Sequence, residues 1–287
     1  MKSILLTGGS GFLGKNLTKH LLAKSLCPRI CIYSRNEHAQ ADMRAMFNGD
    51  PRLRFFIGDV RDKDRLKRAM KGVDVVIHAA ALKRIEVGHY CPTELAKTNI
   101  DGTINVIEAA QDAGVGRVVF VSSDKAFSPC SAYGYSKAFG EALILAANNT
   151  TGDTTKFAAC RYGNVWCSAG SVVPRWKALI AAGAKEVPVT DPSCTRFMMK
   201  VDDAVKLVLS TAEHMKGGEL IIPDLPAYRL GDLAEAMNVK PKLVGLPNFE
   251  KLHESMSADK CSSDAPRLTV DDLRKELATL PALRLAA

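Results

Sequence analysis

The sequence predicts an α/β fold in which a doubly wound parallel sheet is joined to a smaller C-terminal lobe. Three observations lead to this expectation. Apolar runs of strand length alternate with runs of helical periodicity up to residue 161, a glycine-rich turn follows the first apolar run, and prolines become frequent beyond Gly163. Such alternation is typical of a parallel sheet with helices on both faces and a ligand at the carboxyl ends of the strands.

The expected elements follow one another in a regular order. Six strands are expected, at residues 4–6, 29–33, 53–57, 73–77, 117–122 and 156–161. Helices are expected at 15–22, 62–70, 99–113, 133–148 and 202–214, where apolar residues have helical spacing. We therefore assign residues 1–165 to a cofactor-binding domain, to which 197–215 returns, and residues 166–287 to a smaller substrate-binding lobe.

The turn after the first strand has the spacing of a dinucleotide site in a Rossmann-type fold. Gly8 permits the tight turn, Gly11 lets the backbone approach a pyrophosphate, and Gly14 lets the next helix pack closely on the strand. An ordinary strand-to-helix turn is the alternative. Strand, turn and helix stand in the required order, so we expect cofactor contacts throughout the turn, from Gly8, Ser10, Gly11, Phe12, Leu13 and Gly14.

The end of the second strand indicates which dinucleotide is bound. About twenty residues past the last glycine, where an acid would hold a ribose diol, the chain reads Ser34-Arg35. A hydroxyl and a guanidinium suit a 2′-phosphate. We therefore expect NADP rather than NAD, the alternative being that Arg35 is only a solvated surface charge.

Composition and charge narrow the class of protein. Of the 287 residues, 47% are apolar and 24% are charged, as in ordinary globular proteins. The longest apolar run, 73–82, is interrupted by Asp74 and His78 and is too short to span a bilayer. The start of the chain has no secretory signal pattern, so we expect a cytoplasmic protein without a membrane partner.

The basic residues and the cysteines add two further expectations. The net charge of +8 comes from dispersed basic residues with few aromatic residues, which argues against a nucleic-acid partner and suits anionic small molecules. The eight cysteines form no C-x-x-C pair and no zinc-type spacing. We therefore expect free thiols and no metal.

Residues suited to acid–base chemistry follow the strand that ends near Val121. Tyr133 and Lys137 are four apart on an expected helix and share a face, where an ammonium can stabilise a phenolate and make it a usable base. Tyr135 points away from that face, so we expect it to pack in the core or against the substrate. Four polar residues precede the pair, namely Ser122, Ser123, Asp124 and Lys125.

Together these motifs resemble those of the extended short-chain dehydrogenase/reductase family. Within it, the chain is most similar to the UDP-N-acetylglucosamine 4,6-dehydratases, over residues 1 to 255. The segments that carry the resemblance are 54–62, 78–83, 97–103, 123–126, 161–165, 170–174, 195–197 and 250–254. Tyr133 makes the chain similar to the inverting branch that begins the pseudaminic acid pathway rather than to the membrane-anchored branch.

The resemblance implies a reaction. Tyr133, helped by Lys137, takes the proton of the carbon 4 hydroxyl as hydride passes to NADP. Lys125 then removes the carbon 5 proton, Asp124 protonates the departing carbon 6 hydroxyl, and hydride returns to carbon 6. Elimination needs this acid and amine beyond the groups of a plain dehydrogenase. A solvated turn is the alternative for these two residues, and Ser123 completes the catalytic set.

The resemblance also implies binding residues and partners. Besides the glycine turn, cofactor contacts are expected from Ser34, Arg35, Asp59, Val60, Ala79, Ala80, Ala81, Lys83, Asn99, Ser122, Tyr133 and Lys137. Substrate contacts are expected from Lys83, Asn164, Ser171, Val172, Arg196 and Glu250. The expected partners are a UDP-linked nucleotide sugar and further copies of this chain, in a homo-oligomer that is a dimer or larger.

Two departures from those relatives leave the substrate open. Where they carry an arginine in S-R-G-S-V this chain has Ala169, and in place of R-P-G-E-K it has a segment beginning at Pro247. A charge-assisted hydrogen bond is worth about 1.5–3 kcal/mol. The diphosphate must therefore bind less tightly or through other cations, with Arg175, Lys177 and Arg196 as candidates.

Three functions remain compatible with the sequence. The first is a 4,6-dehydratase acting on a UDP-amino sugar, with the configuration at carbon 5 left open. The second is an NADP-dependent nucleotide-sugar epimerase or ketoreductase, which would need Tyr133 and Lys137 but make no net use of Asp124 and Lys125. The third is a non-catalytic NADP-binding protein, against which the intact tyrosine and lysine count.

Overall fold

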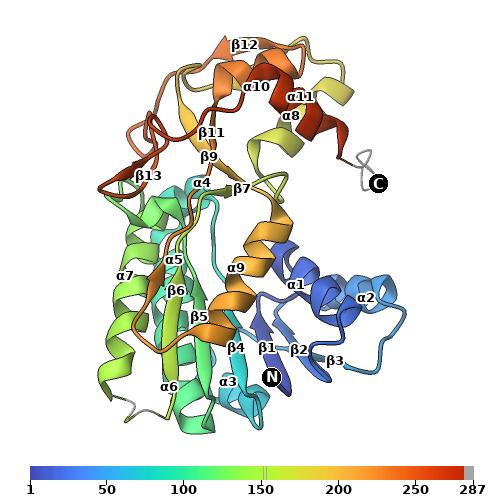
Figure 1. The fold of residues 1–287 in the computed structure, drawn as a ribbon, viewed down its shortest axis with the longest axis vertical. Coiled ribbons are helices and arrows are strands. Elements are labelled where there is room, and N and C mark those ends of the chain that lie inside the picture. The colour runs from blue at the N-terminus through green and yellow to red at the C-terminus, as the bar shows by residue number, and fades with distance from the viewer. Residues whose placement is uncertain (151, 153, 281–287) are drawn as a thin grey trace. The chain divides into compact units, whose positions relative to one another are not determined.

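The computed structural model describes residues 1–150, 152 and 154–280, which form two compact units. Unit 1 comprises Met1–Arg161 together with Val201–Ile222. Unit 2 comprises Tyr162–Lys200 and the chain from Pro223 onward. The chain therefore leaves unit 1, returns to it once and leaves it again (Figure 1).

Unit 1 is built on a parallel sheet of seven strands in the order β10-β6-β5-β4-β1-β2-β3. The strands are β1 (Ser3–Thr7), β2 (Arg29–Ser34), β3 (Leu53–Ile57), β4 (Val75–His78), β5 (Arg117–Val121), β6 (Lys156–Cys160) and β10 (Leu220–Ile221). The expected α/β fold is confirmed, but the expected number of six strands is wrong. The seventh strand, β10, has two residues, which is too short to give an apolar pattern.

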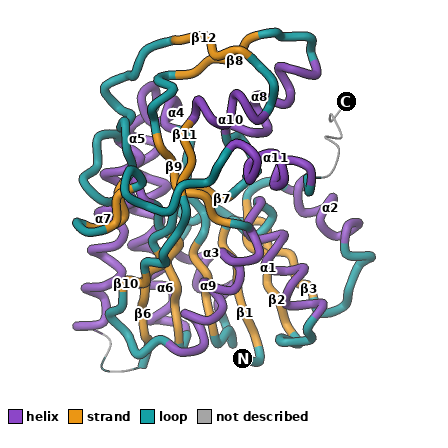
Figure 2. The backbone as a smooth tube through the Cα atoms, turned by 45° about the horizontal axis from the view of Figure 1, so that its top comes forward, coloured by secondary structure: helices purple, strands orange, loops and turns teal. Residues whose placement is uncertain are grey.

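Helices cover both faces of this sheet (Figure 2). One face carries α3 (Lys63–Met70), α6 (Gly102–Ala113) and α7 (Ala132–Ala146), and the other carries α1 (Phe12–Ala23), α2 (Glu37–Met46) and α9 (Val201–His214). The shorter helices are α4 (Ile85–Tyr90), α5 (Pro92–Ala96), the π-helix η1 (Lys97–Asp101), and the 3₁₀-helices η2 (Asp124–Ala126) and η3 (Ala147–Thr150). Strands covered on both faces are apolar along their whole length. Accordingly, every residue of β1 and β4 is buried.

Close packing brings α7 against the end of β5. The Ser131 hydroxyl accepts a hydrogen bond from the Gly134 N–H at 3.1 Å and caps the helix. A Cβ atom at Gly134 would lie 2.5 Å from the Lys125 carbonyl oxygen, and one at Gly140 would lie 2.6 Å from the Phe120 ring. These two glycines therefore let the helix approach the residues that follow β5.

Unit 2 has small sheets and its own apolar core. Its strands pair as β11-β9-β7, β12-β8 and β13-β14. The strands are β7 (Asn164–Val165), β8 (Glu186–Val189), β9 (Thr195–Met199), β11 (Ala227–Arg229), β12 (Lys240–Leu243), β13 (Ser255–Ser257) and β14 (Lys260–Cys261), and the helices are α8 (Val172–Ala181), α10 (Leu230–Ala236) and α11 (Val270–Ala278). Trp166 and Tyr228 meet edge to face in the core, with ring centroids 5.8 Å apart, beside Trp176 and Leu233.

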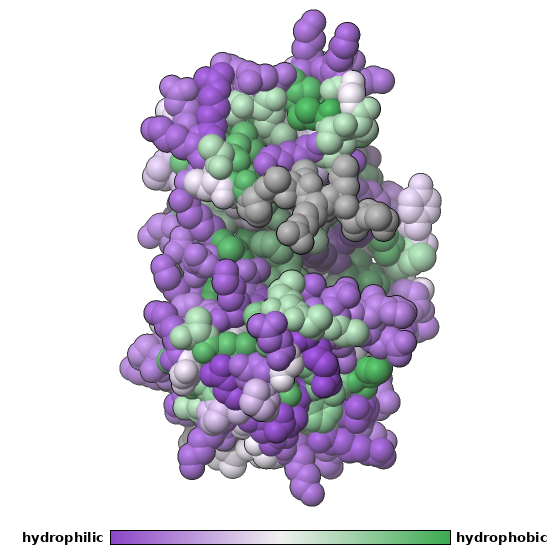
Figure 3. Space-filling model, turned by 90° about the vertical axis from the view of Figure 1, so that its right-hand side faces the viewer, coloured by the Kyte–Doolittle hydropathy of each residue, from purple (hydrophilic) through white to green (hydrophobic). Residues whose placement is uncertain are grey.

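The surface is mostly polar on the face that Figure 3 shows, with small apolar patches between hydrophilic side chains. Among the described residues, no helix combines the length and the apolar character that a bilayer-spanning helix needs. The cysteines are free, and the described histidine, cysteine and acidic residues form no cluster that could hold a metal ion.

Candidate active site

The turn that joins β1 to α1 is shaped by glycine. Gly8 has a φ of +66°, and a Cβ atom there would lie 2.9 Å from Cα of Ala80. A Cβ atom at Gly14 would overlap the carbonyl oxygen of Gly9. Gly11 is the N-cap of α1, and no side chain caps the helix there. The first N–H groups of α1 are thus available to an anion, so the turn fits the pyrophosphate of a dinucleotide.

The end of β2 carries the residues expected to select the cofactor. The Ser34 hydroxyl accepts hydrogen bonds from Ser10 Oγ and Gln40 Nε2, each at 2.9 Å. The Arg35 side chain is half exposed, and its Nη1 lies 3.8 Å from Asp59 Oδ2. Burial alone would raise the pKa of Asp59, but hydrogen bonds and charge from Arg61, with the charge of Arg35, lower it overall. The guanidinium is therefore available at the strand end, beside a carboxylate that stays ionised.

A buried chain of hydrogen bonds lies at the ends of β1 and β4. His78 Nδ1 is 2.7 Å from Thr7 Oγ1, and His78 Nε2 is 3.1 Å from Thr103 Oγ1. Burial, with the charge of Lys137, lowers the pKa of His78 to about 3. The imidazole is thus neutral at physiological pH and links the glycine turn region to α6. Ala79, Ala80 and Ala81 follow directly after it.

Asn99 fixes the loop that follows β4. It lies on η1, a π-turn where the sequence predicted regular helix. Its Oδ1 accepts from the Leu82 N–H at 2.8 Å, and its Nδ2 donates to the Leu82 carbonyl and to Ser136 Oγ, each at 2.9 Å. Lys83 is the next residue, and burial lowers the pKa of its amine. Asn99 thus acts on the loop backbone, which holds the position of Lys83.

Tyr133 and Lys137 share one face of α7, as their spacing predicted. Both are almost fully buried. Lys137 Nζ donates to the Val121 carbonyl at 2.6 Å and lies 4.1 Å from the centre of the Phe120 ring. Burial lowers the pKa of Lys137 to about 7, against an opposing effect of Glu141.

Burial has the opposite effect on the phenol of Tyr133. It raises the pKa of Tyr133, whereas the charge of Lys125 and a hydrogen bond with Ser123 lower it. The groups that favour the phenolate are thus Lys125 and Ser123, and stabilisation of the phenolate by Lys137 stays a prediction. Tyr135, two residues on, is exposed, so the expectation that it packs in the core is wrong.

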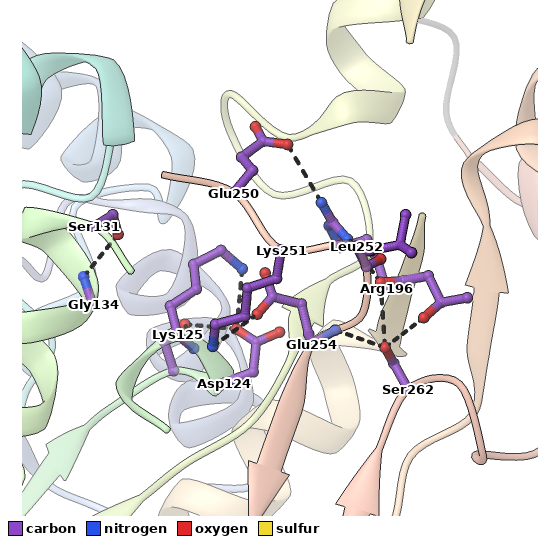
Figure 4. Close-up of polar contacts among 12 residues, drawn as sticks. Asp124, Lys125, Ser131, Gly134, Arg196, Glu250, Lys251, Leu252, Glu254 and Ser262 are labelled. Atoms are coloured by element: carbon purple, nitrogen blue, oxygen red, sulfur yellow. Dashed lines mark hydrogen bonds and ion pairs between the residues drawn. The ribbon is translucent and has the colours of Figure 1, made fainter. Parts of the chain in front are cut away.

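Asp124 and Lys125 form a partly buried ion pair (Figure 4). Lys125 Nζ lies 3.1 Å from Asp124 Oδ1, which also accepts a hydrogen bond from Ser123 Oγ at 2.8 Å. The Asp124 side chain is fully buried and that of Lys125 is 19% exposed. The alternative of a solvated turn is therefore wrong, and an acid and an amine lie next to the tyrosine in unit 1.

Unit 2 gathers a second set of expected residues around β9 (Figure 4). Arg196 donates through Nη1 to the Thr195 carbonyl at 2.8 Å, and its Nη2 is 3.4 Å from Glu250 Oε2. Burial alone would lower the pKa of Arg196, but nearby negative charge, that of Glu254 first and Glu250 also, raises it overall. Two residues expected to contact substrate, Arg196 and Glu250, thus bind each other.

Asn164 and Ser171 belong to the same unit. Asn164 opens β7 and pairs with Met198 of β9. Ser171 is the N-cap of α8, directly before Val172, and its buried hydroxyl has no hydrogen-bond partner among the described residues. A buried hydroxyl at a helix N-terminus can donate to a polar ligand.

Sequence reasoning missed one charged group of the site. Glu141 lies one turn beyond Lys137 on α7, is buried, and pairs with Arg161 of the segment after β6. The spacing of Tyr133, Lys137 and Glu141, four residues each, was a usable signal because it places the three on one helix face.

A parallel sheet with a glycine turn after β1, and a tyrosine and lysine four residues apart on the helix after β5, define the class of short-chain dehydrogenases/reductases. Within that class, the chain belongs to the family described as polysaccharide biosynthesis protein, whose sequence model matches residues 4–269. The resemblance of the motifs is thereby confirmed.

Two relatives of the chain have names that state an activity. The chain is 48% identical over 273 residues to UDP-N-acetylglucosamine 4,6-dehydratase (inverting) of Campylobacter jejuni, covering 94% of this chain and 80% of that protein. It is 40% identical over 265 residues to UDP-glucose 4-epimerase of Rickettsia bellii, covering 89% of this chain and 77% of that protein.

Solved structures share the fold. Pen from Bacillus thuringiensis superposes with a TM-score of 0.92 at 33% identity, covering 97% of this chain and 98% of that one. DesIV, a dTDP-glucose 4,6-dehydratase from Streptomyces venezuelae solved with NAD, superposes with a TM-score of 0.79 at 23% identity, covering 99% and 93%. At that identity the second likeness shows the fold alone.

Proposed function

We propose that the protein is an NADP-dependent hydro-lyase that removes water across carbons 5 and 6 of UDP-N-acetylglucosamine or a related UDP-amino sugar. The observation that carries the proposal is the pair of the buried Asp124 with the partly buried Lys125, which accompanies Tyr133 and Lys137 in the same unit. A dehydrogenase needs only the tyrosine and lysine, whereas elimination needs an additional base and acid. The relative from Campylobacter jejuni supports the same assignment.

The residues of the β1–α1 turn fit the cofactor. Gly8 packs against the backbone of Ala80, the N-terminus of α1 faces the turn without a side-chain cap, and Arg35 stands at the end of β2 for a 2′-phosphate. When bound, the dinucleotide supplies hydride acceptance from carbon 4 and hydride return to carbon 6. Side chains of the protein then have to transfer the protons.

Tyr133 and Lys137 handle the proton of the carbon 4 hydroxyl. Tyr133 accepts it as a phenolate, and the ammonium of Lys137 stabilises that phenolate. Ser123 bonds the phenol and holds its orientation. The ketone that results at carbon 4 makes the carbon 5 proton acidic.

Asp124 and Lys125 can reach the protonation states that elimination requires by exchanging one proton. Moving it from Lys125 Nζ to Asp124 Oδ1 along their 3.1 Å hydrogen bond gives a neutral amine and a neutral carboxylic acid. Burial favours this exchange because it disfavours charged forms. The amine is then the base at carbon 5 and the carboxylic acid protonates the departing carbon 6 hydroxyl.

The nucleotide is assigned to unit 2. The sequence lacks the two arginines of its relatives at 169 and 247, so we propose that Arg196 and the Ser171 hydroxyl take over part of the diphosphate contact. Since Arg196 is held by Glu250 through one long contact of 3.4 Å, a bidentate phosphate can displace that partner.

Mass spectrometry of products tests the proposal. The purified protein is incubated with UDP-N-acetylglucosamine, UDP-glucose and their dTDP counterparts, without added cofactor. Loss of one water from a UDP-amino sugar is expected. An isomer of unchanged mass would favour the epimerase, which is the name that the Rickettsia bellii relative carries, and would overturn the lyase assignment.

Two further expectations belong to this proposal. A homo-oligomer is supported by Tyr135 and Phe139, which are exposed apolar residues four apart on α7, and light scattering on the purified protein measures it. The cytoplasm is the compartment in which we place the enzyme, and cell fractionation measures that.

A further inference from the structure

Glu141 takes no part in the proposed proton transfers, yet it is buried beside the groups that do. Tyr133, Lys137 and Glu141 stand at successive four-residue intervals on α7 and form one stripe. Glu141 is only 5% exposed. A carboxylate at such a position must be hydrogen-bonded or paired, because an isolated buried charge is very costly.

Its partners come from the ends of two strands. Glu141 Oε1 accepts a hydrogen bond from Ser122 Oγ at 2.5 Å and from Arg161 Nε at 2.9 Å, and Oε2 pairs with Arg161 Nη2. Ser122 follows β5, and its N–H donates to the Cys160 carbonyl at the end of β6 at 2.7 Å. Glu141 thus ties α7 to the carboxyl ends of β5 and β6.

Ser122 links the contacts of Glu141 to the catalytic groups. On one side of it, the Val121 carbonyl accepts the hydrogen bond of Lys137 Nζ at 2.6 Å. On the other side, Ser123 bonds Asp124 at 2.8 Å and the phenol of Tyr133. A shift of Ser122 would therefore move the acceptor that orients Lys137 and the hydroxyl that orients Tyr133.

We propose that Glu141 is a positioning residue of the reaction: bound to Ser122 and Arg161, it fixes the strand end that orients Lys137 and Tyr133, and its negative charge favours the protonated form of Lys137. The inference rests on the proposed function, because it assigns Glu141 to that same catalytic helix. It differs from a purely structural ion pair in requiring the charge, and not only the shape, of the carboxylate.

The electrostatic surroundings of Lys137 agree with this role. Burial lowers the pKa of the Lys137 amine to about 7, and the charge of Glu141 opposes that effect. His78, on β4, is neutral at this pH because its own pKa is lowered to about 3. The phenol of Tyr133 is on the same face of α7, with Lys125 and Asp124 beside it. Loss of the Glu141 charge would therefore lower the pKa of Lys137 further.

The test uses three variants that separate charge from shape. Glu141→Gln keeps an acceptor for Ser122 but removes the negative charge while the charge of Arg161 stays. This variant should therefore have the largest effect in lowering the affinity of Lys137 for its proton. Glu141→Gln with Arg161→Gln removes both charges and has a smaller effect. The control, Glu108→Gln, removes a carboxylate from the exposed pair that Glu108 makes with Lys63 on the surface of α6.

The primary measurement is independent of substrate. In NADP-saturated protein with ¹³C-labelled lysine, the resonance that Lys137→Met removes is assigned to Lys137 and titrated. The midpoint is expected to be highest in the unchanged protein, lower in the double variant and lowest in Glu141→Gln, where a fall of about one pH unit or more is expected. A midpoint in both variants equal to that of Glu108→Gln would overturn the proposal.

Activity provides the second measurement. The pH at which kcat falls on the basic side should move down in the same order, with KM changed little. Ser122→Ala should lower kcat because it removes the hydrogen bond from Ser122 to Glu141. Recovery of the original pH profile in the double variant would show a structural pair only and would overturn the inference. If the unchanged protein removes no water from any nucleotide sugar, the proposed function fails while the titration still decides the role of Glu141.

Discussion

At the scale of single residues, Arg35 is the side chain whose charge should decide cofactor choice. It is half exposed at the end of β2, 3.8 Å from an ionised Asp59. Arg35→Ala should weaken NADP binding about 10- to 100-fold, the equivalent of one charge-assisted hydrogen bond, and leave NAD binding nearly unchanged. Fluorescence titration with both dinucleotides measures this, with Arg44→Ala on α2 as control. Equal affinities in the unchanged protein would contradict the assignment.

The Lys125 side chain should be needed for elimination of water but not for oxidation at carbon 4. Its amine lies 3.1 Å from Asp124 and is proposed as the base at carbon 5. Lys125→Ala should lower the rate of water loss by a factor of ~10² to 10⁴ and stop exchange of the carbon 5 proton with deuterated solvent. Transient absorbance of reduced cofactor should persist, since Tyr133 and Lys137 are intact. Unchanged dehydration in this variant would disprove the mechanism.

Because His78 is buried, we expect the protein to lose stability in acid. Its pKa falls from the ordinary 6.5 to about 3 on folding, so the unfolded chain binds a proton that the folded protein does not. The free energy of unfolding should therefore drop as the pH falls from 6.5 toward 3. In His78→Asn this part of the pH dependence should disappear, whereas His214→Asn, which changes an exposed residue of α9, should retain it. Chemical denaturation at a series of pH values measures the difference.

At the scale of elements, the β1–α1 turn depends on a missing side chain. An Ala at 14 would put its Cβ atom into the carbonyl oxygen of Gly9, so Gly14→Ala should cost about 1–3 kcal/mol of stability and weaken NADP binding. Gly116→Ala is the matched control, because its added Cβ would lie 3.4 Å from the Asp74 carbonyl, an ordinary contact. Equal melting temperatures for the two variants would contradict this account of the turn.

Elements with strong periodicity could be predicted from the sequence, and short or long-range features could not. The strand Arg117–Val121 and the helix carrying Tyr133 and Lys137 are close to their predicted positions because their buried apolar residues give a clear sequence pattern. Strand β10 has too few residues to show one, and the π-turn at Asn99 depends on its bonds to Leu82, far along the chain. The Glu141–Arg161 pair joins residues that no local pattern relates.

At the scale of the whole molecule, unit 1 needs the segment that returns to it. Helix α9 buries Val205 and Val208 against the sheet, and its Thr211 contacts Cys160 at 3.2 Å. A chain ending at residue 161 should therefore lack cooperative thermal unfolding. Joining 1–161 to 201–222 through a flexible Gly/Ser linker should restore it, together with NADP binding. Cooperative unfolding of the shorter chain alone would contradict this dependence.

The late arrival of β10 has a consequence for synthesis on the ribosome. Strand β6 pairs with β10 along the edge opposite β5, and β10 is made only after residues 162–200 of unit 2 and the whole of α9. Throughout that interval the nascent chain presents an apolar parallel sheet with an open edge, the kind of surface on which chains associate wrongly. Chaperone capture of nascent chains should accordingly begin once β6 has emerged and end after residue 222. The risk of wrong association is therefore highest before synthesis of the chain is complete.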